Sequence, residues 1–342
     1  MSTVVKRVAV SMLVLVMFVT LAGCGKAAVT PVTKTLKVGL LAGVGGLGDK
    51  SFNDLAYDGA KKAETELGIT LKVAEPPDLA SEEGLLRDLA NAGNDLVIAV
   101  GFDMADPLKK VAAEFPNIKF AVIDATVDGP NVASLVFAEH EGSFLVGALA
   151  ALMSKSNKVG AIPAMDVPFL TRFTKAYEQG AKYIKPDIQV IIKPIGSDFN
   201  AFNDPAKCKS IALSMYAQGC DVIYHAAGGS GSGLFEAAKQ VKKYAIGCNS
   251  DQDYMAPGLI LTSMMKRVDV ATYDAIKGAV DGTFKTGVNL YNVANGGIGI
   301  TDLTYTKDVI GTANIARIDE IKKGIVDGSI KVIDTLATPA AQ

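Results

Sequence analysis

The chain has 342 residues, which is enough for two domains of about 150 residues each. Lysine and arginine together number 34 against 36 aspartates and glutamates, so the formal net charge is −2. This balance excludes the basic excess that nucleic-acid-binding proteins carry, and no nucleic acid partner is expected.

The first 23 residues have the pattern of a lipoprotein signal peptide. A short basic region, Lys6 and Arg7, is followed by an apolar run and by Leu21-Ala22-Gly23-Cys24. A membrane-spanning helix needs about 20 apolar residues, whereas sixteen residues separate Arg7 from Cys24. We therefore expect cleavage before Cys24, lipid on its sulfur and amine, and residues 24–35 as a tether. The protein would then be exported and held in the bilayer by its lipid, on the outer face of the plasma membrane or in the periplasm.

Cysteines and histidines favour neither a disulfide scaffold nor a metal site. Cleavage would leave a chain of net charge −4 with three cysteines, Cys208, Cys220 and Cys248. An odd number in an exported chain predicts at least one free thiol. The two histidines, His140 and His225, are isolated, and the sequence has no Cys-x-x-Cys or His-x-x-x-His spacing. No metal and no cofactor are expected.

From Leu36 onward, short apolar runs alternate with helical patterns, which predicts an α/β fold with parallel sheets covered by helices on both faces. We expect the first strands at 36–42, 70–74, 95–100, 119–124 and 131–137. Helical spacing of apolar residues appears between them, for example from Phe52 to Leu67 and from Leu108 to Phe115.

The pattern then begins again. Lys158-Val159-Gly160 repeats Lys37-Val38-Gly39 121 positions later, and Asp221-Val222-Ile223 repeats Asp95-Leu96-Val97 126 positions later. A third match, between 120–122 and 244–246, has an offset of 124. These offsets predict two similar lobes in series, whose loops at the carboxyl ends of the strands face each other across a cleft.

The remainder of the chain is expected to cross between the lobes and form the hinge. It contains a helical pattern at 268–281, a glycine-rich apolar stretch at 288–300 and an amphipathic helix at 315–326. We expect residues 36–137 plus about 264–287 in the N-terminal lobe, and residues 138–263 plus about 288–335 in the C-terminal lobe. Closure around a ligand would be a rigid-body motion.

The loop at 43–54 can be interpreted in two ways. Gly43, Gly45 and Gly48 spell G-x-G-x-x-G between a strand and a helix, as in dinucleotide-binding enzymes. However, residues 49–53 separate the last glycine from the apolar helical face, and the first acid near the next strand is Glu75. The inserted Asp49, Ser51, Phe52 and Asn53 instead offer a carboxylate, a hydroxyl, an aromatic face and an amide, which suit a neutral ring compound. The alternative for Phe52 is a core position on its helix.

A second glycine-rich loop, residues 226–233, follows the expected strand at 221–225. Exposed amides before a helix can donate to hydroxyls or anions, and the alternative is a flexible linker. Residues 229–233 spell Gly-x-Ser-x-Gly, but no histidine follows them in the chain. No set of nucleophile, base and orienting group is visible, so we do not expect an enzyme.

Several motifs, in order along the chain, resemble the basic membrane protein (BMP) family of lipoproteins. They are Asp49-Lys50-Ser51-Phe52-Asn53, Val122-Ile123-Asp124, Glu141-Gly142-Ser143-Phe144-Leu145-Val146-Gly147, the loop at 226–233, Asp251-Gln252, and Leu261-Thr262-Ser263 with Lys266. The resemblance extends from about Lys37 to Asp281. It is to the PnrA-like purine nucleoside receptors of ABC transporters.

The resemblance implies a type I periplasmic-binding-protein fold, a purine-nucleoside-like ligand and a permease partner. Matched residue by residue, Phe52 and Tyr224 would stack on the two faces of the purine. Asn53 matches the position that hydrogen-bonds the base. Three residues match positions near the sugar: Asp124, Gly229 and Lys266.

Two positions depart from the family pattern. Gly43 stands where the family usually has an aspartate that reads the base edge, and Asn249 stands where an aspartate holds ribose hydroxyls. Each lost charge-assisted contact is worth about 1.5–3 kcal/mol, so Gly43→Asp with Asn249→Asp is expected to raise nucleoside affinity if purines are the native ligands. The ligand would be a purine nucleoside or a related heterocycle. The alternative is a signalling or structural lipoprotein that keeps the fold and has lost small-molecule binding.

Overall fold

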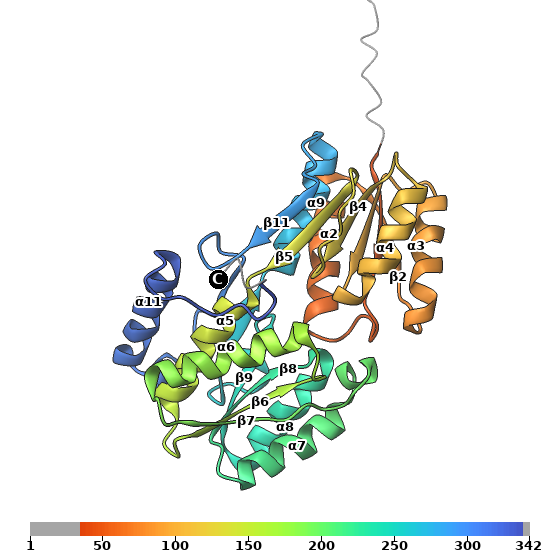
Figure 1. Ribbon diagram of the computed structural model, residues 1–342. Coiled ribbons are helices and arrows are strands. Elements are labelled where there is room, and N and C mark those ends of the chain that lie inside the picture. The colour runs from red at the N-terminus through yellow and green to blue at the C-terminus, as the bar shows by residue number, and fades with distance from the viewer. Residues whose placement is uncertain (1–34, 338–342) are drawn as a thin grey trace, which may run out of the picture. The chain divides into compact units, whose positions relative to one another are not determined.

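The computed structural model describes residues 35–337 (Figure 1). The expected signal peptide, Cys24 and nearly all of the tether lie outside the described residues. Residues 35–337 fold into two lobes, each built on a six-stranded sheet. None of the helices in this part of the chain is long and apolar enough to cross a bilayer.

The first lobe holds a parallel sheet in the order β11-β5-β4-β3-β1-β2. Its strands are β1 (Lys37–Leu41), β2 (Thr70–Ala74), β3 (Leu96–Val100), β4 (Lys119–Ile123), β5 (Val132–Phe137) and β11 (Gly287–Tyr291). Its helices are α2 (Phe52–Leu67), α3 (Glu82–Asn91), α4 (Ala105–Glu114) and α9 (Val268–Asp281). Alternate residues of β3 belong to two separate cores, Leu96 and Ile98 on one side and Val97 and Ala99 on the other, so both faces of the sheet are covered.

The second lobe repeats this plan. Its sheet has the order β12-β10-β9-β8-β6-β7, and all neighbours are parallel except β12, which is antiparallel to β10. The strands are β6 (Lys158–Pro163), β7 (Gln189–Ile192), β8 (Val222–Ala226), β9 (Tyr244–Asn249), β10 (Ile260–Lys266) and β12 (Ile298–Ile300). The helices are α5 (Glu139–Met153), α6 (Pro168–Ile184), α7 (Pro205–Ala217), α8 (Gly231–Val241), α10 (Lys307–Ile310) and α11 (Thr312–Val326).

Five short 3₁₀ turns complete the described elements, and several follow strands directly. They are Leu79–Ser81, Phe102–Met104, Phe199–Phe202, Gly228–Ser230 and Asp253–Met255.

The predicted fold class and the internal repeat are confirmed. The three matched segments lie on β1 and β6, β3 and β8, and β4 and β9, which occupy equivalent places in the two sheets. All three cysteines in the described residues are buried and free.

The chain crosses between the lobes three times, after β5, after β10 and after β11. All of β10 belongs to the second sheet and all of β11 to the first. The second segment of the N-terminal lobe therefore extends from about 267 to 291, rather than from 264 to 287.

Two helices of the second lobe pack with their backbones in close approach. A Cβ added at Gly147 on α5 would overlap the carbonyl oxygen of Tyr177, and one at Gly180 on α6 would overlap that of Phe144. Glycine is thus required on both helices for this spacing. In Figure 1, α5 and α6 lie side by side next to the hinge.

Candidate functional site: a cleft between the lobes

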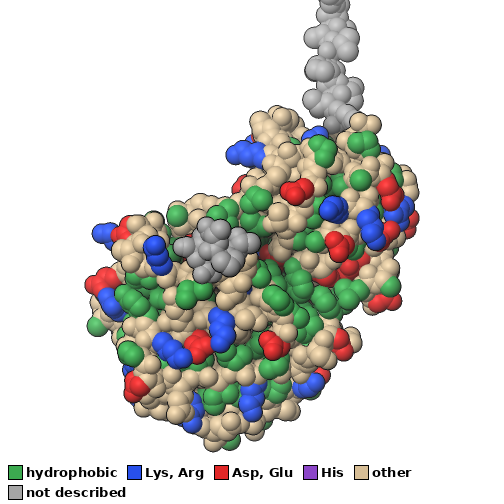
Figure 2. Space-filling view, viewed as in Figure 1, with side chains coloured by type: hydrophobic (Ala, Val, Ile, Leu, Met, Phe, Trp, Pro, Cys, Tyr) green, Lys and Arg blue, Asp and Glu red, His purple; other side chains and the backbone are tan. Residues whose placement is uncertain are grey.

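A cavity of about 400 Å³ lies where the carboxyl ends of the strands of both sheets meet. The first lobe lines it with the loops after β1, β3 and β4, and the second lobe with the loops after β8 and β9 and the start of α6. Small-molecule sites have volumes of about 300–1,000 Å³. On the face shown in Figure 2, hydrophobic side chains gather along the junction of the lobes.

Two aspartates hold the loop between β1 and α2 in shape. Asp49 accepts hydrogen bonds from the backbone amides of Ser51, Asn53 and Asp54, at 2.8, 2.9 and 3.2 Å. Asp54 in turn accepts from the amides of Gly48 and Lys50 at 2.7 and 2.8 Å. Asp49 lines the cavity, but its oxygens cap the first backbone amides of α2. The positive end of the helix dipole also stabilises a carboxylate at this position.

Phe52 and Asn53 both line the cavity, as expected. The Asn53 Oδ1 atom accepts a hydrogen bond from the Gly43 amide at 2.8 Å. Among the described residues its Nδ2 group donates to no protein acceptor, so an amide donor remains for a ligand. The ring of Phe52 is half-buried, and the Lys266 ammonium lies 4.9 Å from its centroid.

Lys266 and Asp124 come together from the ends of β10 and β4, in different lobes. The Lys266 side chain is 1 % exposed and its Nζ lies 2.5 Å from Asp124 Oδ2 and 2.9 Å from Glu139 Oε1. Burial alone would lower the pKa of Lys266, but the two carboxylates outweigh burial and raise it. Burial raises the pKa of Asp124 to about 7, in spite of the opposing effect of Lys266. Asp124 Oδ1 is buried and has no hydrogen-bond partner among the described residues.

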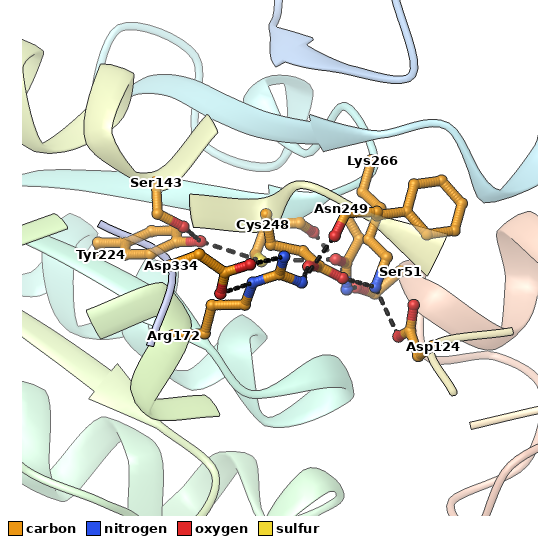
Figure 3. Close-up of polar contacts among 11 residues, drawn as sticks. Ser51, Asp124, Ser143, Arg172, Tyr224, Cys248, Asn249, Lys266 and Asp334 are labelled. Atoms are coloured by element: carbon orange, nitrogen blue, oxygen red, sulfur yellow. Dashed lines mark hydrogen bonds and ion pairs between the residues drawn. The ribbon is translucent and has the colours of Figure 1, made fainter. Parts of the chain in front are cut away.

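Arg172 on α6 extends this charged network to the hinge (Figure 3). It donates to Glu139 Oε2 at 2.5 Å and to the Phe137 carbonyl oxygen at 2.7 Å, on the two sides of the crossing between β5 and α5. Its other nitrogens form a bidentate pair with Asp334 at 2.8 and 2.7 Å. Glu139 is therefore shared between Lys266 in the cleft and Arg172 behind it.

Tyr224 does not line the cavity. Its side chain is 0 % exposed, and its hydroxyl lies 3.3 Å from Ser143 Oγ and 3.4 Å from Cys248 Sγ. The ring stacks on Tyr177 at a centroid distance of 5.3 Å, inside the second lobe. Figure 3 shows it directed at Ser143, away from Asp124. The prediction that Tyr224 supplies the second stacking ring does not hold, because β8 presents this side chain to α5 and α6.

The aromatic rings that the second lobe presents to the cavity come from elsewhere. They are Phe169 and Phe173 on α6, and Phe199 and Phe202 in a 3₁₀ turn. Sequence reasoning missed this set, although Asp198-Phe199-Asn200-Ala201-Phe202 places two aromatic residues directly before α7. Phe102 of the first lobe stacks on Phe169 at 4.8 Å.

Ser51 and Asn249 join the two lobes. The Asn249 amide donates to Ser51 Oγ at 3.0 Å, and Ser51 Oγ donates to the Cys248 carbonyl oxygen at 3.2 Å. Next to them, Ser250 Oγ and Gln252 Nε2 donate to the Lys50 carbonyl oxygen at 2.6 and 3.2 Å. Ser51 is fully buried, so its hydroxyl serves this contact. Asn249 also lines the cavity.

Gly229 and Gly43 both lie near atoms of other segments of the chain. A Cβ on Gly229 would lie 3.6 Å from the Asp49 Cβ of the other lobe, which is an ordinary contact. A Cβ on Gly43 would lie 2.8 Å from the Val100 carbonyl oxygen. The expectation that an aspartate at position 43 would raise affinity is therefore not supported, because the backbone leaves no room for its Cβ.

Residues 36–335 match the model of a protein family described as ABC transporter substrate-binding protein PnrA-like. The chain belongs to this PnrA-like family. An ABC transporter nucleoside-binding protein of Lactococcus lactis subsp. cremoris is 32% identical over 355 residues, covering 96% of this chain and 99% of the relative. An uncharacterized lipoprotein of Pyrococcus horikoshii is 37% identical over 80% of this chain and 71% of its own. The crystal structure of a solute-binding protein of an ABC transporter system from Aeropyrum pernix K1 superposes with a TM-score of 0.81, at 32% identity, covering 88% of this chain and 94% of that one.

Membership fixes the general role of the PnrA-like protein. It is a substrate-binding protein of an ABC transporter and not an enzyme, which confirms the prediction from the sequence. A small-molecule ligand and a transporter permease are its partners. Relatives named lipoproteins agree with an exported, membrane-anchored protein.

Proposed function

We propose that this PnrA-like protein binds a purine nucleoside or a related heterocycle in the cleft and delivers it to its permease. The observation that carries the proposal is one cavity that combines aromatic faces with a buried carboxylate. Asp124 Oδ1 has no partner among the described residues, so it is free to accept from a sugar hydroxyl. Hydrogen bonds to charged groups contribute about 1.5–3 kcal/mol.

The aromatic rings supply the other half of a nucleoside site. Phe52 comes from the first lobe and Phe202 from the second, and both line the cavity. A base held between two such rings gains stacking energy that depends little on the identity of the base. The Asn53 amide adds one donor for the base. The Lactococcus relative is named a nucleoside-binding protein, which agrees with this ligand class.

We also propose that the protein is anchored by lipid on Cys24. The Leu21-Ala22-Gly23-Cys24 sequence after a short apolar run supports this, as do the relatives named lipoproteins. Metabolic labelling with a palmitate analogue should mark the wild-type chain and not a Cys24→Ala chain. Equal labelling of the two would contradict the anchor.

Calorimetric titration tests the ligand. We expect saturable binding of at least one of adenosine, guanosine and inosine, and weaker binding of ribose. Phe52→Ala and Phe202→Ala should each weaken nucleoside binding by about 1–3 kcal/mol, the range for loss of one base-stacking ring. Phe284→Ala, a half-buried ring outside the cavity, is the control. Absence of binding for nucleosides, bases, flavins and sugars would favour a lipoprotein that has lost its ligand.

A further inference from the structure

Two further carboxyl side chains lie together near the cleft, Asp103 at its wall and Glu82 buried beside Asp103. Asp103 belongs to the 3₁₀ turn after β3 and lines the cavity. Glu82, the first residue of α3, is 1 % exposed and hydrogen-bonds to Asp103. Neither Glu82 Oε1 nor Asp103 Oδ2 finds an N–H or O–H donor elsewhere in the described residues.

The two side chains titrate as a coupled pair, because each is buried beside the other. Burial, followed by the hydrogen bond to Asp103, raises the pKa of Glu82 to about 8. Burial also raises the pKa of Asp103, but the same hydrogen bond lowers it. Glu82 is therefore the donor and Asp103 the acceptor. Asp103 lines the cavity, and in its ionised form a carboxyl group is an acceptor only.

The strand order places Asp103 between the two ends of the expected site. β4, β3 and β1 are neighbours in the first sheet, and Asp124, Asp103 and Gly43 lie in the segments that follow them, respectively. Adjacent strands lie about 4.8 Å apart, so the three segments follow one another along this edge of the sheet. Asp124, whose side chain is 3 % exposed, lines the same cavity and has a buried oxygen without a partner among the described residues.

We propose that the Asp103 side chain, at the wall of the cavity, accepts hydrogen bonds from the N–H edge of the bound heterocycle. It would do so in place of the side chain that Gly43 lacks. A carboxylate can take two parallel N–H groups, such as the ring N–H and amino group of guanine. It repels an edge that carries only ring nitrogen acceptors. The cleft thus selects 6-oxopurine nucleosides over purines without a donor. This inference rests on the proposed function.

Four ligands separate this inference from the proposed function: guanosine, inosine, adenosine and purine riboside, which has no donor on that edge. By calorimetry, wild-type protein should bind guanosine at least ten times more tightly than purine riboside. Asp103→Asn should weaken guanosine binding about 10- to 100-fold, the loss of a charged acceptor. The same variant should leave purine riboside within twofold. Asp106→Asn, which removes an exposed carboxylate from the same segment, should change neither.

The outcomes are distinguishable. Wild-type protein that binds none of the four overturns the proposed function and this inference with it. Wild-type binding with equal losses for all four ligands in Asp103→Asn, or with no loss, overturns the inference alone. Glu82→Gln retains a donor toward Asp103, so it should keep the preference for guanosine. Loss of that preference in a variant that unfolds at the same urea concentration as wild type would also overturn the inference.

Discussion

Glu82 is a glutamic acid that the fold keeps uncharged near neutral pH. Burial, its hydrogen bond to Asp103 and the negative charges of Asp103 and Asp78 raise its pKa from 4.5 to about 8. The native state therefore holds a proton that the unfolded chain releases above about pH 4.5. The stability that this group contributes is fully present below pH 4.5 and is lost as the pH rises through about 8.

The variant Glu82→Gln isolates this effect from other titrating groups. The free energy of unfolding of wild type should fall relative to that of Glu82→Gln between pH 5 and pH 8. The slope of the difference should not exceed about 1.4 kcal/mol per pH unit, the value for one proton. Urea unfolding at each pH measures both curves. Curves that stay parallel throughout this range would show that Glu82 ionises normally in the native protein.

For single residues, the sequence predicted which chemical groups belong to the site better than it predicted where each side chain points. Asp124 and Lys266 lie 142 positions apart and were both expected near the ligand, and the structure places them in contact. Tyr224 was expected there too, but every residue of β8 is buried. A strand buried on both faces has no alternation of polar and apolar residues, so its sequence could not show which side chains face the cleft.

At the scale of elements, α5 and α6 depend on two glycines. Gly147 ends the Glu141-Gly142-Ser143-Phe144-Leu145-Val146-Gly147 motif. Glycine is needed there because the Tyr177 carbonyl oxygen occupies the space that a Cβ would take. The first five strands and the helices α2 and α9 were predicted to within a few residues, because their periodicity is local. The close approach of α5 and α6 could not be, since it depends on contacts between segments about 30 residues apart.

Gly147→Ala should destabilise the protein although alanine favours helix. The gain in helix propensity is at most about 1 kcal/mol, whereas forced repacking costs about 1–3 kcal/mol. We expect a net loss in urea unfolding. Gly84→Ala on α3 is the matched control, because a Cβ there meets nothing within 4 Å. It should be neutral or stabilising by up to about 1 kcal/mol. Equal midpoints for the two variants would mean that α5 and α6 can move apart without cost.

At the scale of the whole molecule, the lobes are joined by hydrogen bonds on the cleft side as well as by the three crossings. Asn249 bonds to Ser51, and Lys50 receives two donors from the second lobe. An open form would lose all of these bonds. They therefore bias the equilibrium towards closure, and a ligand that binds only the closed form gains from that bias.

Removing the Asn249 amide should shift the equilibrium towards the open form. Asn249→Ala should increase the radius of gyration of ligand-free protein in small-angle X-ray scattering, and a saturating ligand should restore the wild-type value. The affinity of Asn249→Ala for the ligand should fall in proportion to the fraction of closed protein that is lost. Asn289→Ala is the control, because the Asn289 side chain on β11 donates only to the nearby carbonyl oxygens of Lys285 and Gly287. An unchanged radius with reduced affinity would assign Asn249 to direct ligand contact alone.

Because of the bidentate pair of Arg172 and Asp334, the end of the chain determines when the hinge is completed during synthesis. Arg172 is made about 160 residues before its partner. Until residue 334 has been synthesised, both sheets can form, but the arginine that supports Glu139 lacks the second carboxylate, which binds its other nitrogens. The Arg172–Asp334 pair behind the hinge is therefore the last part of the receptor to assemble. A chain that ends before residue 334 would fold its two sheets and yet lack a complete hinge.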